Sequence, residues 1–149
     1  ERELAQIREE LTEQGYLRKQ KGKQRPQAAL PPLEFTSSDG FKILVGRNNT
    51  QNDKLTLKIA NKNDMWLHTK DIHGSHTVVF AEGREISDTA ILEAAQLAAY
   101  YSKARESSQV PVDYTLVRYV SKPSGARPGM VIYVNNKTVY VTPKANISE

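Results

Sequence analysis

The sequence predicts an α+β domain in which a mostly antiparallel β-sheet packs against one long, alanine-rich helix. Three observations support this prediction. Short segments of β-branched and aromatic residues recur through residues 34–149, and turn-forming residues separate them. Residues 88–105 have the apolar periodicity of a long helix. Two pairs of the strand segments flank turn sequences that suit antiparallel hairpins, which favours a sheet covered by a helix.

The strand segments are distributed along the whole domain. In chain order they are residues 34–36, 42–45, 65–68, 77–80, 112–120, 130–134 and 138–142. The first two form a predicted hairpin around Ser37–Gly40, whose Asp-Gly pair suits the left-handed geometry of a tight turn. The last two form a second predicted hairpin around Asn135 and Asn136, which tolerate positive φ.

Two helices are predicted inside the domain. The long helix has N-cap candidates at Ser87 and Asp88, and its alanines allow it to lie close to the sheet. A shorter helix that ends near Ala60, capped by Asn52 or Asp53, is favoured as well. The apolar residues of that shorter segment also alternate as they would in a strand, so a strand is the alternative.

Two further segments precede the domain. Residues 1–15 resemble the end of a coiled-coil helix, because Leu4, Ile7 and Leu11 recur at helical spacing among polar residues. Residues 16–33 combine basic residues with Gln, Gly and Pro, which predicts a flexible basic linker. Since the chain begins within a helix and without Met, we expect it to be a piece of a longer protein.

The composition excludes several classes of function. A chain of 149 residues with 38% hydrophobic and 26% charged residues fits one soluble globular domain with polar extensions. No apolar run approaches the roughly 20 residues that span a bilayer, so no membrane partner is expected. The absence of cysteine excludes disulfides, thiolate zinc sites and cysteine nucleophiles, and it favours a cytoplasmic location.

Charge is segregated along the chain, although the net charge is only +4. Residues 16–33 and 114–148 contain Lys and Arg but no Asp or Glu, whereas acidic residues concentrate in residues 1–13 and 82–106. If the two basic stretches fold onto one side of the molecule, they create a surface that attracts polyanions. This distribution predicts nucleic-acid binding.

Three histidines and a tryptophan are candidates for a functional site. His68, His73 and His76 lie on two predicted strands and the turn between them, and this spacing is not typical of a metal site. We therefore predict no metal and expect the imidazoles to satisfy backbone groups or to contact nucleic acid. Trp66 is expected in the core, and base stacking is the alternative if its ring is exposed.

The segment Ser121–Gly129 is a candidate phosphate-contacting loop. Its glycines allow backbone N–H groups to approach an anion, and Lys122 and Arg127 supply positive charge. It lacks the P-loop pattern, and the chain has no nucleophile elbow, Ser-Lys pair or paired carboxylates. No catalytic residue and no cofactor are predicted, and a metal-free nuclease that uses His68 and His76 is the remaining catalytic alternative.

Several motifs together resemble one known family. They are Gly46-Arg47-Asn48-Asn49-x-Gln51-Asn52-Asp53-x-Leu55-Thr56, Asp64-Met65-Trp66-Leu67-His68, Gly74-Ser75-His76, Glu93-Ala94-Ala95, Ala98-Ala99-Tyr100-Tyr101-Ser102, Val112-Asp113-Tyr114-Thr115, Lys122-Pro123 and Pro128-Gly129. Over residues 36–143 they are similar to the RNA-binding (NFACT-R) domain of the NFACT family. Residues 1–14 would then be the end of the family's long coiled coil. The family often has Pro where this chain has His73, so the resemblance implies that His73 is dispensable.

The resemblance implies the RNA-binding domain of a ribosome-associated quality control factor, without enzyme activity of its own. The family's full-length proteins bind a large ribosomal subunit obstructed by peptidyl-tRNA, so rRNA and tRNA are the expected partners. By motif, the expected site residues are Arg47, Asn48, Asn49, Trp66, His68, Ser75 and His76. Side-chain chemistry adds Lys70, Arg118, Lys122 and Arg127. The alternative is a surface adhesin for fibronectin, which only a historical name in the family suggests.

Overall fold

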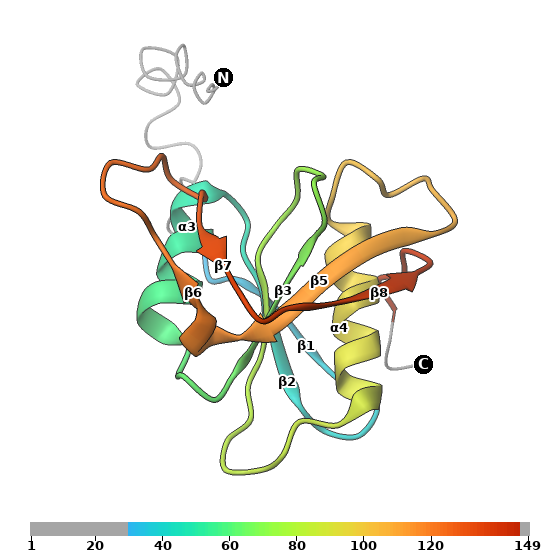
Figure 1. Cartoon of the computed structure of the whole chain (residues 1–149). Helices are drawn as coiled ribbons and strands as arrows, with labels where there is room; N and C mark the ends of the chain where they lie inside the picture. The colour runs from blue at the N-terminus through green and yellow to red at the C-terminus, as the bar shows by residue number, and fades with distance from the viewer. Residues whose placement is uncertain (1–29, 147–149) are drawn as a thin grey trace, which may run out of the picture. The chain divides into compact units, whose positions relative to one another are not determined.

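The computed structural model describes residues 30–146 of the chain (Figure 1). The predicted coiled-coil helix, residues 1–15, and linker residues 16–29 lie outside the described residues. From Pro31 onward the chain belongs to one compact unit. Within the described part of the chain, no helix is both long and apolar enough to cross a membrane.

The structure is an α+β fold with antiparallel strands, which confirms the predicted class. The strands are β1 (Leu33–Thr36), β2 (Lys42–Val45), β3 (Met65–Thr69), β4 (Thr77–Val79), β5 (Val110–Leu116), β6 (Val120–Ser121), β7 (Ile132–Tyr133) and β8 (Lys137–Val141). The large sheet has the order β1-β2-β4-β3-β5-β8, and β6 pairs with β7 in a small second sheet. The helices are α3 (Asn49–Lys54), its π-helical continuation (Leu55–Ile59), α4 (Asp88–Tyr100) and a 3-10 turn (Val117–Tyr119).

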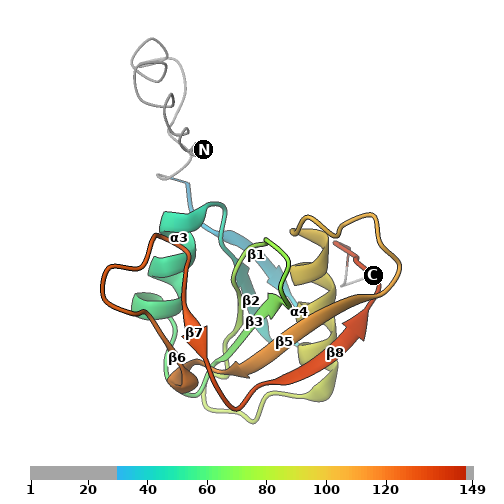
Figure 2. The same ribbon diagram turned by 45° about the horizontal axis from the view of Figure 1, so that its top comes forward.

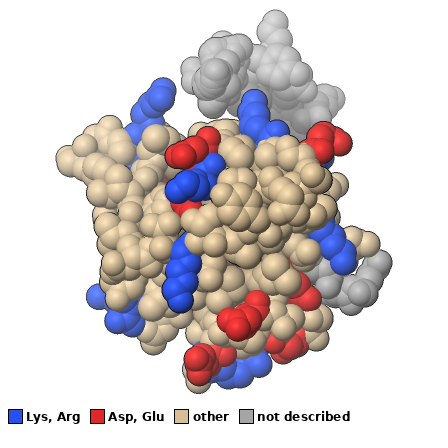
Figure 3. All heavy atoms as spheres, turned by 45° about the vertical axis from the view of Figure 1, so that its right-hand side comes forward, with Lys and Arg blue, Asp and Glu red and all other residues tan. Residues whose placement is uncertain are grey.

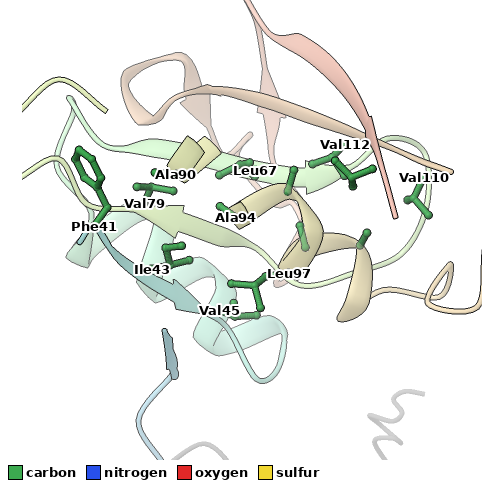
Figure 4. Close-up of a cluster of buried hydrophobic side chains, with 14 residues drawn as sticks. Phe41, Ile43, Val45, Leu67, Val79, Ala90, Ala94, Leu97, Val110 and Val112 are labelled. Atoms are coloured by element: carbon green, nitrogen blue, oxygen red, sulfur yellow. The ribbon is translucent and has the colours of Figure 1, made fainter. Parts of the chain in front are cut away.

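The large sheet carries a hydrophobic core on each face. Helix α4 packs on one face, where the alanines of its buried side let it lie close to Ile43 and Leu67 (Figure 4). Because successive strand residues point to opposite faces, Trp66 belongs to the other core. There it packs with Leu55 from the π-helical continuation and with Val120 from β6. Full burial of each large apolar side chain stabilises the fold by about 1.5–3 kcal/mol.

The antiparallel register brings several loops to the same edge of the large sheet. Val45 pairs with Thr77, which pairs with Leu67, so the end of β2, the start of β4 and the end of β3 lie together. Thr69 pairs with Val112, which places the start of β5 there as well. We call the loops gathered here the upper edge: residues 46–48, 70–76, 101–109 and 122–130 (top of Figure 1).

The loops at the opposite ends of the strands form the lower edge: residues 37–41, 61–64, 80–87 and 117–119. Figure 2, in which the top comes forward, shows the start of α3 and the end of α4 on either side of the turn between β3 and β4. The upper edge therefore combines the beginning of one helix, the end of another and a strand turn.

Both predicted helices exist, with different bounds. The cap at Ser87 is confirmed, because its hydroxyl accepts a hydrogen bond from Ala90 N at 3.0 Å. Helix α4 ends at Tyr100 rather than at residue 105, since the chain turns there and Ser102 bridges to a neighbouring segment. The shorter helix is confirmed over the strand alternative, but its cap is Asn48; the prediction of a cap at residue 52 or 53 was wrong.

The first hairpin is confirmed by the pairing of β1 with β2, and Gly40 adopts a φ of 93° in its turn. The single strand predicted for residues 112–120 was wrong, because Val117 N bonds to Asp64 O and the chain leaves the large sheet in a 3-10 turn. The second hairpin was also wrong. Asn135 does have a positive φ of 58°, but β7 pairs with β6 whereas β8 pairs with β5.

Candidate nucleic-acid interface

The loop that precedes α3 is held by side-chain amides. Asn48 Oδ1 accepts a hydrogen bond from Gln51 N at 2.8 Å, which caps the helix. Gln51 reaches back and its Oε1 accepts a hydrogen bond from Arg47 N at 2.7 Å, in a reciprocal arrangement similar to a capping box. Arg47 Nε donates to Pro31 O at 2.6 Å. These contacts position the Arg47 side chain at the upper edge and leave Asn49 exposed beside it.

The Gly-Ser-His segment is joined to the end of α4. Gly74 bridges to Ser102, and a Cβ atom at Gly74 would lie 2.8 Å from Ser102 Cβ, so only glycine allows this approach. Ser75 N donates to Tyr101 O at 3.1 Å, and Lys103 N donates at 2.9 Å to the carbonyl oxygen of His73, which directly precedes the segment. The segment and the residues after α4 therefore form one backbone-linked wall.

This wall and the loop before α3 border an open cleft of about 320 Å³. Its lining contains three cations and no carboxylate. The cations are Arg47, Lys103 and Arg105, and the residues expected from the motifs that lie in the cleft are Arg47, Asn48, Asn49 and Ser75. The structure thus brings together one group of the predicted site residues.

Trp66 and the two histidines of the motifs lie elsewhere, in the second core. Trp66 and His76 are each 1% exposed. The Trp66 ring centroid lies 5.8 Å from that of His68, 5.4 Å from that of His76 and 4.6 Å from that of Tyr133. Because the Trp66 and His76 side chains are enclosed by protein, they pack the interior in this structure and are not presented to a ligand.

Hydrogen bonds specify one neutral form of His76. Its Nε2 faces the carbonyl oxygen of Gly129 at 3.1 Å, so Nε2 carries the proton, and Nδ1 accepts a hydrogen bond from the Thr56 hydroxyl at 2.8 Å. Burial, reinforced by the nearby His68, lowers the pKa of His76 to about 3. Burial also holds the pKa of His68 below its usual value.

The candidate phosphate loop is fastened to α3. Lys122 Nζ lies 3.3 Å from Asp53 Oδ2 and donates to the carbonyl oxygens of Arg127 at 2.5 Å and Met130 at 3.2 Å. Gly129 N donates to Asp53 Oδ1 at 3.0 Å. Lys122 therefore holds the loop in place. The side chain of Arg127 is exposed and makes no hydrogen bond or ion pair with any residue that the structure describes.

Charge differs between the two edges. The upper edge has six cations, Arg47, Lys70, Lys103, Arg105, Lys122 and Arg127, against two acids, Asp71 and Glu106. The lower edge has three cations, Lys62, Arg84 and Arg118, against four acids, Asp39, Asp64, Glu82 and Glu85. In Figure 3, acidic side chains gather in the lower part of the face in view together with some Lys and Arg, and other Lys and Arg project in its upper part beside a few acidic ones.

The prediction that the two basic stretches gather on one surface is tested only for the second stretch, which does not stay together. Most of the first stretch, residues 16–29, lies outside the described residues. The second stretch is divided, because Arg127 lies at the upper edge and Arg118 at the lower edge, where it donates to the Asn63 side chain. Lys70, directly after β3, lies at the upper edge. Among residues 30–146, no group of His, Asp and Glu is placed to hold a metal ion.

Comparison with known proteins identifies the domain. A family model described as the NFACT protein RNA binding domain matches residues 32–135, which run from just before β1 to the turn before β8. The chain belongs to the NFACT family. The matched residues contain every segment that borders the cleft.

Individual relatives agree with this assignment. The chain is 51% identical over 148 residues to the Rqc2 homolog RqcH of Bacillus subtilis and 46% identical over 142 residues to that of Streptococcus suis. These matches cover 97% and 95% of this chain but only 26% and 25% of the relatives. A solved C-terminal structure of the fibronectin/fibrinogen-binding protein FBPS from Streptococcus suis has a TM-score of 0.78 at 46% identity, covering 93% of this chain and 55% of that one.

Seven residues that line the cleft of this NFACT domain were not predicted as site residues: Asn52, His73, Gly74, Tyr101, Ser102, Lys103 and Arg105. Tyr101, Lys103 and Arg105 lie in the stretch that the charge pattern assigns to acids. The missed signal is local: two cations at alternate positions follow a Tyr-Tyr pair where the long helix ends. Their proximity to Arg47 depends on the tertiary fold.

Proposed function

We propose that the upper edge binds RNA through its phosphates, without reading base sequence. The observation that carries this proposal is the cleft in which Arg47, Lys103 and Arg105 converge with no carboxylate in the lining. Each cation that neutralises a phosphate releases condensed counterions, and such interactions position RNA but carry no sequence information. The family description supports RNA as the polyanion.

Other upper-edge residues extend this surface. Lys70 and Arg127 are exposed, and neither side chain is paired with another described residue. The amide of Asn49 adds a hydrogen-bonding group between the cleft and the loop that carries Arg127. An RNA strand lying along the upper edge would therefore meet cations from four separate loops.

We further propose that the parent protein is a ribosome-associated quality control factor in the cytoplasm. The name Rqc2 homolog carried by the relatives supports this role. The RNA partners would then be the rRNA and tRNA of an obstructed large ribosomal subunit. The chain spans about a quarter of those relatives' length, so this domain would be the RNA-binding part of a larger protein.

Binding without catalysis is part of the same proposal. The metal-free nuclease alternative needs His76 as an acid or base at the surface. His76 is 1% exposed and both of its ring nitrogens are engaged. Incubation with labelled RNA tests this point, since cleavage that His76→Ala abolishes would reverse it.

A salt titration with matched variants tests the RNA proposal. Fluorescence anisotropy would follow binding of the whole chain to labelled tRNA and to rRNA fragments. We expect log K to fall linearly with log salt, and Arg47→Ala with Lys103→Ala to reduce the slope by about 0.7–0.9 for each phosphate that is no longer neutralised. Lys58→Ala is the matched control, because Lys58 is exposed and does not line the cleft. A flat salt plot, or equal reductions in slope for both variants, would contradict the proposal.

Fibronectin binding is the competing function, because the solved relative carries that name. Fibronectin and RNA would be offered to the same protein. Binding to fibronectin that persists at high salt and that RNA does not displace would rank the adhesin first. Displacement by RNA, or dissociation in salt, would leave the cationic upper edge as the binding surface.

A further inference from the structure

We propose that the cleft takes one unpaired nucleotide, whose base inserts between the loop before α3 and the wall at the end of α4. This inference rests on the proposed function, because the rest of the upper edge must hold the RNA by its phosphates. It adds a preference for bulged or single-stranded RNA over a perfect duplex. No base identity is implied.

Free hydrogen-bonding groups line the cleft. The Asn49 amide, the Ser75 hydroxyl and the Tyr101 hydroxyl make no hydrogen bond with a residue in the described range. Together they offer donors and acceptors, as the edges of an unpaired base require. In a duplex those edges are paired, and only the phosphates would reach the cations. The amide and the two hydroxyls therefore suit an unpaired base better than they suit a phosphate.

Planar groups stand at one side of the cleft. The Arg105 guanidinium lies 4.1 Å from the ring centroid of Tyr100 and 5.9 Å from that of Tyr101, and its Nε donates to Tyr100 O at 2.8 Å. One face of the guanidinium is thereby held against Tyr100. Bases stack on both aromatic rings and arginine planes, so its other face is a stacking surface that already has a fixed orientation.

The size and the rigidity of the cleft agree with a single nucleotide. Its volume of about 320 Å³ is at the lower end of small-ligand sites, which run from about 300 to 1,000 Å³. Its two sides are fixed by backbone hydrogen bonds, Gly46 N to His76 O at 3.0 Å and Ser75 N to Tyr101 O at 3.1 Å. A site that is already formed loses little conformational entropy when it binds.

Two RNA hairpins with the same stem test the inference. One is fully paired and the other carries one bulged nucleotide, so their phosphate counts differ by one. We expect the whole chain to bind the bulged hairpin at least about fivefold more tightly, which is the lower end of what stacking of one base contributes. Equal affinity for the two hairpins would overturn the inference and leave the proposed function standing, whereas no binding to either would overturn both.

Arg105→Lys separates stacking from charge. Lysine keeps the positive charge but lacks the guanidinium plane, so we expect the bulge preference, which is the ratio of the affinities for the two hairpins, to fall to about twofold or less. Ser75→Ala is a second variant that should also reduce the preference, and Lys58→Ala should retain it. A full bulge preference in both Arg105→Lys and Ser75→Ala would contradict the assignment of the nucleotide to this cleft.

Discussion

His76 and Gly129 are joined by a hydrogen bond of 3.1 Å from the imidazole Nε2 to the carbonyl oxygen. Gly129 N in turn donates to Asp53 Oδ1. The buried His76 imidazole therefore connects the loop between β6 and β7 to the core beside the large sheet. The bond requires a proton on Nε2, and Nδ1 already accepts from Thr56, so the loop is bound to the neutral form of His76.

Stability is predicted to fall in mild acid. The pKa of His76 is about 3 in the folded chain and about 6.5 when unfolded, so between these values the unfolded state binds the extra proton. The free energy of unfolding should be highest above pH 6.5 and fall by up to about 1.4 kcal/mol per pH unit below it. Urea unfolding at about pH 7.5 and about pH 5 measures this. His76→Gln should weaken the dependence, and equal pH slopes in the two proteins would contradict the argument.

Gly46→Ala should be strongly destabilising. A Cβ atom there would lie 1.9 Å from Asn52 Oδ1, and Asn52 is buried and accepts a hydrogen bond from His76 N. We expect a decrease of about 3 kcal/mol or more in the free energy of unfolding. Gly125→Ala is the control: its φ of 79° gives strain, but no atom lies within 4 Å, and the decrease should be nearer about 1 kcal/mol. Equal decreases for Gly46→Ala and Gly125→Ala would show that overlap with Asn52 does not determine the cost of a side chain at Gly46.

Lys122 and Arg127 are predicted to act differently, although one loop carries both. Lys122→Ala removes an ion pair and two hydrogen bonds within the protein, so it should lower stability by about 1–2 kcal/mol. Arg127→Ala should leave the unfolding midpoint unchanged and weaken RNA binding. Measurements of unfolding and of RNA affinity on both variants check this. A destabilised Arg127→Ala variant would contradict the assignment of stability to Lys122 and of RNA binding to Arg127.

Arg118→Ala should leave RNA affinity unchanged within about twofold. Arg118 lies at the lower edge, where its guanidinium bonds the Asn63 side chain, and the cleft is at the opposite edge. Arg105→Ala is the comparison, because both variants remove one cation from an exposed arginine. An equal decrease of affinity in the two would mean that net charge, rather than the upper edge, attracts RNA.

Asp113 anchors the crossing from the large sheet to the small one. It is 2% exposed and accepts hydrogen bonds of 2.6 Å from both Tyr133 Oη and Thr138 Oγ1. Tyr133→Phe leaves a buried carboxylate with one fewer donor, so we expect the free energy of unfolding in urea to fall by about 1–3 kcal/mol. Tyr140→Phe, at a ring that is 64% exposed, should cost nothing measurable. A neutral Tyr133→Phe would show that this hydrogen bond is dispensable.

Periodicity in the sequence was sufficient for the elements that local physics determines. The alanine face and the Ser87 cap of α4, and the Asp-Gly turn of the first hairpin, depend on residues that are neighbours in the chain. The motif from Gly46 to Asp53 was also visible. The roles of the individual residues in this motif were not visible, because Asn52 and Asp53 bind groups from distant segments rather than capping a helix.

The sequence by itself determined the α+β class, the face that α4 buries and the set of motifs that marks the family. The tertiary structure alone decided that β7 pairs with β6 while β8 pairs with β5, that Trp66 and His76 are enclosed, and that Arg47 meets Lys103 and Arg105 in one cleft. The physical reason is that periodicity records which side chains face a core. Strand register and the positions of loops depend on interactions between segments far apart in the chain, which no local pattern contains.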